Sequence, residues 1–452
     1  MRACPPRPAR PGPPDMPRQL EVWLSGTHVG TLAQIDGRLS FSYAPDWLAN
    51  SSATPLSFSL PLQAAPFDDR ATRPFFAGLL PEGAKRKGVA LALHVSRQND
   101  FALLDGIGGE CAGAVTLLEP GQTPQPVNAP DAVRWLDAAE LVRTIDDMPS
   151  RPMRAGDADL RLSLAGAQDK LPVVAEGGRI GLPRFGTPST HILKPAIPGI
   201  EASVLNEGFC MALAAALKLD VAPAAVHTVG EGADARRYLL VARYDRQLTA
   251  SGQRQRLHQE DFCQALGVPP ETKYQNEGGP DLAQAFALLR QATRPSAPHI
   301  LKLLDYVVFN ALIGNHDAHA KNFSLLVTPR GAVLAPLYDA LATAVYSRLT
   351  DKMAMKIGGK YKFTEVQARH WERFAQDAGL SPAQVKKRVL DIARRLPALA
   401  QATLAAFEAQ GHSHPVLRQI VALIESRCAL TIRRLTLQPT DADPDPTGAA
   451  VD

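Results

Sequence analysis

The stretch from residue 314 to residue 323 reads Gly314-Asn315-His316-Asp317-Ala318-His319-Ala320-Lys321-Asn322-Phe323. An apolar run at 303–313 precedes it, and a strand-like run at 323–327 follows it. This context predicts a loop between a helix and a strand, where the backbone is free to direct side chains at a ligand. We therefore expect Asp317 and Asn322 to lie together in a loop.

The Asp-x4-Asn spacing of Asp317 and Asn322 is typical of a protein-kinase catalytic loop. In such a loop the Asp accepts the proton of the substrate hydroxyl, and the Asn holds magnesium. A second metal-binding Asp should follow after one hairpin, and Asp339 occurs there. The same spacing at Asp305 and Asn310 lies inside the apolar run, so we interpret that pair as two polar residues of one helix. The loop position and the downstream Asp favour Asp317.

Length and composition predict a soluble protein of two or three domains. The chain has 452 residues, 45% hydrophobic and 21% charged, with a net charge of +4. This charge is too small to indicate nucleic-acid binding by bulk electrostatics. A local basic set at 386–395 is better interpreted as a solvated helix face.

The five cysteines are scattered and form no Cys-x2-Cys pair, which predicts reduced, mostly buried thiols in a cytosol. No apolar stretch approaches the roughly 20 residues that span a bilayer. Residues 1–18 are rich in Pro and Arg but lack the apolar centre of a secretory signal, and Met16 is an alternative start. These features predict a cytoplasmic protein without a membrane segment.

Strand patterns dominate the first half of the chain and helical patterns the second. Alternating strands occur at 20–24, a hairpin at 171–182 and further strands at 191–194 and 237–244. From Asp281 onward nearly everything is predicted to be helical except short strands around 323–338. This order predicts an α+β fold with the two lobes of a protein kinase, a strand-rich N-terminal lobe and a helical C-terminal lobe. We expect a disordered tail at 1–18, an α+β subdomain at 19–120, a linker with a short helix at 121–160, the nucleotide-binding part of the core at 161–250, a helical lobe with the catalytic loop at 251–437, and a second disordered tail at 438–452.

Two further segments could contact phosphates. Residues 162–170 read Leu-Ser-Leu-Ala-Gly-Ala-Gln-Asp-Lys, and their small side chains would allow close approach to a phosphate. The segment lacks the Gly-x-Gly-x-x-Gly of ordinary protein kinases and is not a Walker motif, so the residues alone favour a turn before a strand. Lys194 ends a predicted strand, where it could reach a phosphate or simply be solvated.

Taken in order, these segments resemble the HipA family of serine/threonine kinase toxins. The resemblance covers roughly residues 19–435 and is carried by eight blocks. They are 163–170, 190–195, Asn206-Glu207, 243–246, 259–261, Lys273-Tyr274 with 277–280, 317–323, and Tyr338-Asp339.

The resemblance implies a role for each matching position. Asp317 would be the catalytic base, and Asn322 and Asp339 would hold Mg²⁺. Glu207 would pair with the strand lysine, and Ser163 would be the site of inactivating autophosphorylation. The ATP site would comprise Ala165, Gly166, Ala167, Gln168, Asp169, Lys170 and Lys194 at the phosphates, the strand end Ala242, Arg243 and Tyr244 at the adenine, and His319, Ala320, Lys321, Asn322, Tyr338 and Asp339.

The resemblance also implies partners. The substrate would be a protein, typically an aminoacyl-tRNA synthetase whose phosphorylation stalls translation. A small helix-turn-helix antitoxin would hold the kinase, and DNA would be contacted only through that antitoxin. Two alternatives stay open: a small-molecule kinase on the same fold, and a corepressor that has lost turnover. Intact Asp317, Asn322, Asp339 and Lys194 argue against the corepressor.

Several residues near these motifs have competing interpretations. His316 and His319 could suggest a metal site, but no carboxylate or Cys spacing completes one, so a phosphate or water contact is favoured. Asp245 is either structural or a ribose contact. The segment Gln259-Glu260-Asp261 precedes an amphipathic run and predicts a helix cap.

Overall fold

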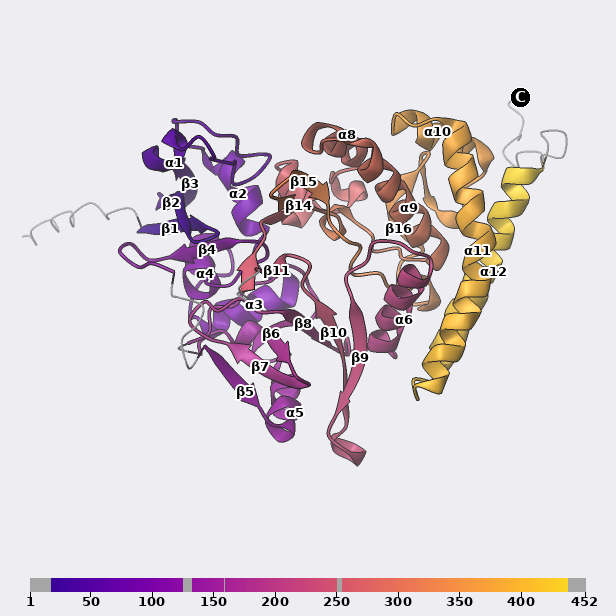
Figure 1. The fold of residues 1–452 in the computed structure, drawn as a ribbon, viewed down its shortest axis with the longest axis horizontal. Coiled ribbons are helices and arrows are strands. Elements are labelled where there is room, and N and C mark those ends of the chain that lie inside the picture. Colours follow the sequence, from indigo (N-terminus) through magenta and orange to yellow (C-terminus); the bar gives the residue numbers. More distant parts are fainter. Residues whose placement is uncertain (1–17, 125–131, 158, 250–253, 438–452) are drawn as a thin grey trace, which may run out of the picture.

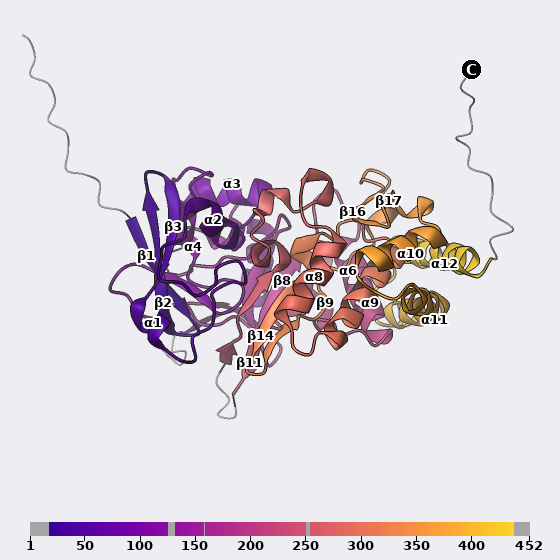
Figure 2. The same cartoon turned by 90° about the horizontal axis from the view of Figure 1, so that it is seen from above.

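A computed structural model of the chain describes residues 18–124, 132–157, 159–249 and 254–437. A strand-rich N-terminal subdomain, a central sheet and a helical lobe follow one another along the long axis (Figures 1 and 2). Buried apolar side chains form three clusters, one centred in each part. The disordered tails expected at 1–18 and 438–452 lie outside the described residues, except that Arg18 begins the first strand.

The N-terminal subdomain is an antiparallel four-stranded sheet with helices packed on it. Its first strand shows why the sequence folds this way, because Leu20, Val22 and Leu24 are buried while the residues between them are partly exposed. The sheet order is β3-β2-β1-β4. The elements are β1 (Arg18–Leu24), β2 (Thr27–Ile35), β3 (Arg38–Tyr43), α1 (Pro45–Ala49), α2 (Asp69–Ala77), α3 (Gly83–Ala92), α4 (Asp100–Ile107) and β4 (Val115–Leu118).

The central sheet has six antiparallel strands in the order β5-β7-β6-β8-β10-β9. Gly177 and Gly178, both with positive φ, form the tight turn between β6 and β7. The elements of this part are β5 (Val133–Leu136), α5 (Ala138–Asp147), β6 (Leu171–Glu176), β7 (Arg179–Pro183), β8 (His191–Pro195), α6 (Ser203–Ala216), β9 (Ala224–Val229) and β10 (Arg236–Ala242).

The segment expected as a linker at 121–160 contains a strand as well as the short helix α5. That strand, β5, pairs with β7 at the edge of the central sheet. β5 is only four residues long, too short for an alternating pattern to identify it as a strand. Its conformation is stabilised by pairing with a strand distant in sequence. Residues 133–136 are therefore part of the central sheet and not of a linker.

The helical lobe carries the longest helices of the described chain, with α11 and α12 side by side at its outer edge (Figures 1 and 2). Its helices are α7 (Phe262–Ala265), α8 (Leu282–Ala292), α9 (Ala297–Ile313), α10 (Ala368–Asp377), α11 (Pro382–Ala409) and α12 (Pro415–Thr436). Small antiparallel pairings accompany them: β11 (Arg246–Leu248) with β12 (Arg254–Arg256), β14 (Ser324–Thr328) with both β13 (Gln259–Asp261) and β15 (Gly331–Leu334), and β16 (Lys352–Ile357) with β17 (Lys360–Lys362).

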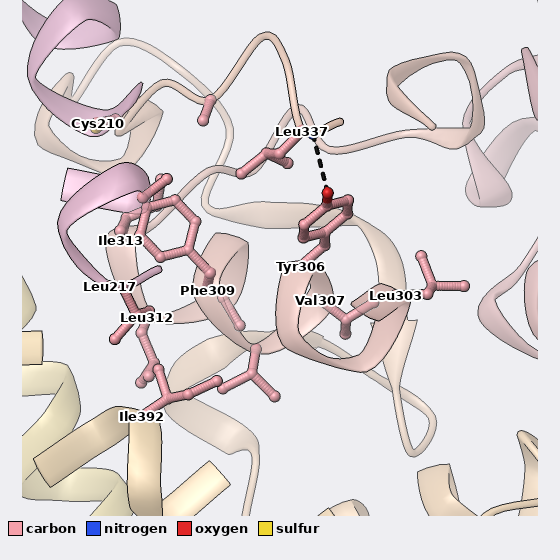
Figure 3. Packing of buried hydrophobic residues seen from close by; sticks show 14 of the residues in the cluster. Cys210, Leu217, Leu303, Tyr306, Val307, Phe309, Leu312, Ile313, Leu337 and Ile392 are labelled. Carbon is pink, nitrogen blue, oxygen red and sulfur yellow. Dashed lines mark hydrogen bonds between the residues drawn. The ribbon is translucent and has the colours of Figure 1, made fainter. Parts of the chain in front are cut away.

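Helix α9 is the centre of this lobe, and its burial explains the apolar run at 303–313. Tyr306, Phe309 and Leu312 lie in one buried cluster that also includes residues of α6 and α11 (Figure 3). The Tyr306 hydroxyl accepts a hydrogen bond from the Leu337 N–H at 3.1 Å (Figure 3). Leu337 precedes Asp339 by two residues, so this packing fixes the segment that carries Asp339.

The second Asp-x4-Asn pair lies within α9, as predicted. Arg388 of α11 holds the Asp305 carboxylate, and the Asn310 side chain donates to the Tyr306 carbonyl at 2.9 Å. The expectation of helix beyond Asp281, apart from strands around 323–338, is wrong for β16 and β17. This hairpin packs on α8 and α10, so its strands are stabilised by tertiary contacts that the local sequence does not reveal.

The cysteines and the apolarity of the helices bear on two predictions from composition. Cys111, Cys210, Cys263 and Cys428 are free and buried, as expected, and Cys4 lies outside the described residues. Of the helices in the described ranges, none has both the length and the apolarity to cross a membrane.

Candidate active site

A cavity of about 400 Å³ lies where the central sheet meets the helical lobe. Residues from both lobes line the cavity, so its walls come from segments far apart in the sequence. From the predicted site the lining includes Ala165, Gly166, Ala167, Gln168, Lys170, Lys194, Ala242, Arg243, Tyr244, Asp317, His319, Lys321, Asn322, Tyr338 and Asp339. Asp169, Ala320 and Ser163 do not line it.

The catalytic loop begins where α9 ends, at Gly314. Gly314 has φ +77°, and a Cβ atom there would meet the Ala344 side chain at 2.8 Å, so only glycine fits this helix end. His316 then fixes the loop to the helical lobe. Its Nδ1 bonds the Thr350 carbonyl at 2.9 Å, and its Nε2 bonds Arg427 at 3.0 Å. Both ring nitrogens are thus occupied, and His316 is structural.

The Asp317 side chain is exposed at the mouth of the cavity. The Tyr274 hydroxyl donates to Asp317 Oδ1 at 2.6 Å, and the Asp317 N–H donates to the Asn315 side chain at 3.1 Å. Although exposed, the carboxylate has enough protein around it for desolvation to raise its pKa, against the lowering effect of Tyr274 and Lys273. Asp317 Oδ1 thus already accepts a hydrogen bond from a hydroxyl group.

Asp339, Lys194 and Glu207 form a charge cluster that lines the cavity, with Lys194 and Glu207 buried and Asp339 partly exposed. Lys194 Nζ donates to Glu207 Oε1 at 2.6 Å and is paired with Asp339 Oδ1, so the expected pairing of Lys194 with Glu207 is confirmed. Desolvation opposes the charges, but Lys194 holds the pKa of Asp339 well below its usual range. Desolvation by itself would lower the pKa of Lys194. The Asp339 and Glu207 carboxylates outweigh this effect, so that the pKa of Lys194 is raised. The charged forms of Lys194 and Asp339 are thus favoured, whereas burial raises the pKa of Glu207 against the effect of Lys194.

Asn315 connects the catalytic loop to the segment of Asp339. Its side-chain amide donates to Asn310 Oδ1 at 2.9 Å and contacts the Asp339 carbonyl at 3.3 Å. Asp339 itself has φ +52°, a left-handed conformation that is uncommon for a residue with a side chain. The position of the Asp339 carboxylate is therefore set by both its backbone and the loop.

The small residues at 165–168 form a tight turn over the cavity. Gly166 has φ +109°, and a Cβ atom there would meet Lys170 Nζ at 2.6 Å, so a side chain would displace that lysine. Lys170 Nζ donates to the Ala165 carbonyl at 2.8 Å. Burial lowers the pKa of Lys170, and the nearby Asp339 opposes that effect.

Asp169 and Ser163 face away from the cavity. Asp169 pairs with Lys85 of α3 at 2.5 Å, which fastens the turn to the N-terminal subdomain. Ser163 is 0% exposed and donates its hydroxyl to the Leu79 carbonyl at 2.8 Å. A phosphoryl group can reach Ser163 only if this segment leaves its place.

The strand end at Ala242 uses part of its backbone for pairing. The Ala242 N–H donates to the Pro223 carbonyl at 2.8 Å and the Arg243 N–H to the Thr190 carbonyl at 2.9 Å. Any backbone contact with adenine therefore falls to the carbonyl groups and to Tyr244. The ring of Tyr244 lies 5.7 Å from that of Tyr338, so two aromatic faces border this end of the cavity.

The Arg243 side chain turns away from the cavity into a buried ion network. It donates to Asp245 at 2.9 and 2.7 Å and to Glu110 at 3.1 Å. Arg246 also pairs with both carboxylates. Both Asp245 oxygens are occupied, which favours its structural interpretation over a ribose contact.

The rest of the catalytic loop supplies further polar groups. His319 is buried with an unpartnered Nδ1, and burial, assisted by Lys273 and Lys321, lowers its pKa so that it is neutral. Lys321 pairs with Asp261 at 2.6 Å. Ala320 is buried below the surface of the cavity. Asp261 also forms the predicted helix cap, a capping box with Gln264.

These residues fit a magnesium nucleotide. Asp339 and Asn322 offer the oxygen ligands that Mg²⁺ prefers, and the nucleotide phosphates would complete its shell. Four lysines line the cavity, and the unpartnered His319 Nδ1 is a buried polar atom without a protein partner. Within the described ranges no group of three or more His, Cys, Asp or Glu could hold a metal by itself, which argues against a zinc site there.

Tyr274, Lys273 and Asn315 were not among the predicted site residues. Tyr274 and Lys273 occur in a block that resembles the family, but no local spacing relates them to Asp317, which lies 43 residues after Tyr274. Their contact depends on how the loop after α7 folds back across the lobe.

Comparison with known proteins agrees with this geometry. The family model for the HipA N-terminal domain matches residues 20–118, and that for the HipA-like C-terminal domain matches residues 162–400. The chain belongs to the HipA family. It is 31% identical over 394 residues to the serine/threonine-protein kinase toxin HipA of Shewanella oneidensis, covering 84% of this chain and 87% of that protein. The family expected from the sequence is confirmed.

Two further relatives support the same conclusion. The candidate kinase Y4mE of Sinorhizobium fredii is 48% identical over 378 residues, or 83% of this chain and 89% of that protein. The HipA chain in a Shewanella oneidensis complex of HipA, HipB and operator DNA superposes with a TM-score of 0.75 at 28% identity, covering 92% of this chain and 96% of that chain. The α+β, two-lobed fold is thereby confirmed, and this HipA-family chain is a protein kinase.

Proposed function

We propose that this HipA-family kinase transfers the γ-phosphoryl group of ATP to a serine or threonine of a protein substrate, with Asp317 as the base. The observation that carries this proposal is the convergence of Asp317, Asn322, Asp339 and Lys194 on one cavity. Asp317 already accepts a hydrogen bond from a hydroxyl group, which is the contact that a base needs with its acceptor.

Each group has a distinct part in the proposed transfer. Asp317 orients the acceptor hydroxyl and takes its proton. Lys194, held by Glu207, and Lys170 offset negative charge on the phosphates. Asp339 and Asn322 would hold Mg²⁺, which when bound with ATP neutralises charge on the transferring phosphoryl group. Asn315 keeps the catalytic loop and the Asp339 segment at a fixed separation.

The partners follow from the family. Because a relative is known in complex with HipB and operator DNA, we propose a HipB-like helix-turn-helix antitoxin that carries the DNA contact. We propose a protein substrate, by the same resemblance an aminoacyl-tRNA synthetase, whose modification inhibits translation. The cytoplasm, where ATP and such a substrate occur together, is the proposed location.

Ser163 is the proposed site of autophosphorylation. Its hydroxyl is buried against Leu79, so modification requires that residues 163–170 leave the cavity. A phosphate on Ser163 adds about −1.5 to −2 charges, which the buried position cannot accept. The modified segment would therefore stay out, and the nucleotide site would lose Gly166 and Lys170.

The decisive experiment compares wild type with Asp317→Asn, using magnesium-[γ-³²P]ATP and a cell extract. Wild type should label a discrete protein, and the variant should lose transfer by at least 100-fold while it binds ATP with unchanged affinity, because general-base catalysis contributes about 10²–10⁴-fold. Asp305→Asn, in the buried pair of α9, is the control for a carboxylate outside the cavity. Undiminished transfer by Asp317→Asn would contradict the assignment, and mass spectrometry of the same samples reports phosphate on Ser163.

A further inference from the structure

A second cavity, of about 510 Å³, adjoins the first at Asp317. Ile197, Tyr274, Asp317 and Leu341 line both cavities, so the two spaces share a boundary that includes the proposed base. The second cavity contains none of the predicted phosphate-binding residues 165–170 and neither Lys194 nor Asp339. It therefore reaches Asp317 without contacting the proposed phosphate-binding groups.

The wall of this second cavity is mainly apolar. Ile197, Ile200, Leu341, Leu349, Met353 and Tyr361 line it. Two of its polar wall groups already have partners, since His316 bonds Thr350 and Arg427, and Thr343 Oγ1 accepts from the His316 N–H at 2.8 Å. Glu277 and Lys352 are exposed at its edge and carry opposite charges. The wall can thus bind an apolar side chain.

The Tyr274 hydroxyl marks the acceptor position between the two cavities. It donates to Asp317 Oδ1 at 2.6 Å, the bond that the hydroxyl of a substrate serine or threonine would make. The Tyr274 ring packs edge-on against His319 with centroids 5.0 Å apart. The phenolic hydroxyl therefore stands in for the acceptor, which must replace it.

We propose that the second cavity receives an apolar side chain two positions from the phosphorylated serine or threonine of the protein substrate. This inference rests on the proposed kinase function and deepens it by naming the acceptor chemistry. In an extended segment, residues two positions apart point to the same side and lie roughly 6–7 Å apart. When the acceptor side chain points to Asp317, the side chain two positions away points into the adjoining apolar cavity.

The test uses the full-length kinase, magnesium-ATP and a panel of serine-centred peptides. Leucine, alanine or aspartate stands at the second position before or after the serine. Leucine on one side should raise kcat/KM at least about tenfold over alanine, the usual range for apolar discrimination. Anisotropy of the labelled peptides with the Asp317→Asn chain gives a binding readout that needs no turnover.

Leu349→Asp polarises the cavity at its exposed edge, and Leu62→Asp is its matched control. Both leucines are 38% exposed, but Leu62 lies in the N-terminal subdomain. Leu349→Asp should abolish the preference for leucine and leave ATP affinity unchanged, whereas Leu62→Asp should keep both. The proposal requires both results.

The possible failures are distinguishable. Equal kcat/KM for leucine, alanine and aspartate peptides, or an unchanged preference in Leu349→Asp, overturns the cavity assignment while the kinase function stands. If only intact extract proteins are labelled, an acceptor site without an apolar residue at either second position overturns it too. Absence of transfer to any peptide or protein overturns the proposed function and this inference together.

Discussion

At the residue scale, the contact between Tyr274 and Asp317 controls the base. The hydrogen bond stabilises the carboxylate, so Tyr274→Phe should raise the pKa of Asp317 and move the acid limb of the kcat/KM profile to higher pH. Above that limb the variant should show a lower KM for the acceptor, because no hydroxyl competes for Asp317. Tyr361→Phe, which removes a hydroxyl with no bond to Asp317, is the control and should leave the acid limb in place. An acid limb unchanged by Tyr274→Phe would contradict the role of this bond.

Lys194 has a structural role in addition to its proposed catalytic one. Lys194→Met would leave the Glu207 and Asp339 carboxylates without their shared partner, at a cost of about 3–5 kcal/mol in the free energy of unfolding. Thermal denaturation should show this loss. The double variant Lys194→Met/Glu207→Gln should recover part of the stability yet remain inactive. Lys302→Met, which breaks a pair with the exposed Asp220, should have a much smaller effect.

The sequence could predict which residues come together where local spacing decides their positions. Asp317, Asn322 and Asp339 lie in or just after one loop, and they line the same cavity as predicted. Asp169 shows the limit, because neighbouring residues of a turn can face opposite sides and Lys85 draws this one outward. Tyr274 could not be assigned, since its contact with Asp317 depends on the tertiary path of a distant loop.

At the element scale, α12 fixes the catalytic loop through Arg427. This buried guanidinium bonds the Ala311 carbonyl at 2.7 Å and His316 at 3.0 Å, with Phe363 beneath it. Arg427→Leu keeps the packing but leaves buried acceptors without a donor, a loss of about 1–3 kcal/mol. We expect a kcat lowered about tenfold or more with ATP affinity largely kept, measured by steady-state kinetics and nucleotide titration.

The control for this prediction lies on the same helix. Arg418 is exposed and pairs with Glu408, so Arg418→Leu should leave kcat unchanged. An equal fall in kcat for both variants would assign the effect to α12 in general and not to Arg427.

Long periodic elements were predictable and short ones were not. The helical structure expected beyond Asp281 includes α10, α11 and α12, whose apolar faces repeat over several turns. β5 and the β16-β17 hairpin consist of three to six residues each, and their pairing partners decide their conformation. The predicted helices differ from the missed strands mainly in the number of residues over which the apolar pattern repeats, and less in residue type.

At the scale of the whole molecule, buried charges join the N-terminal subdomain to the kinase core. Glu110 is 1% exposed and pairs with Arg243, Arg246 and Arg256, close to the strand end that borders the nucleotide cavity. Removal of one partner from such a network leaves an uncompensated buried charge. The N-terminal subdomain therefore supports the nucleotide site directly, which the division of the sequence into separate domains did not reveal.

A second contact between these parts gives a pH dependence. Glu260 of β13 accepts hydrogen bonds from Ser57 Oγ at 2.5 Å and from the Phe58 N–H at 2.9 Å in the N-terminal subdomain. Burial raises the pKa of Glu260 to about 7, despite these two bonds. The folded state thus holds the proton more tightly than the unfolded state does. Its stabilising contribution is complete below the ordinary pKa of 4.5 and is lost as the pH rises to about 7.

Glu260→Gln should remove this dependence, because glutamine stays neutral and can still accept from Phe58. Near pH 4.5 the variant and wild type should have the same melting temperature. Above pH 7 the variant should melt at a higher temperature, with a free energy of unfolding larger by on the order of 3 kcal/mol. Glu372→Gln, on the exposed face of α10, controls for the loss of one negative charge and should show no such difference. A constant gap between Glu260→Gln and wild type from pH 4.5 to 8 would mean that Glu260 does not titrate on folding. In that case the contacts between Glu260 and the N-terminal subdomain would contribute equally to stability across this pH range.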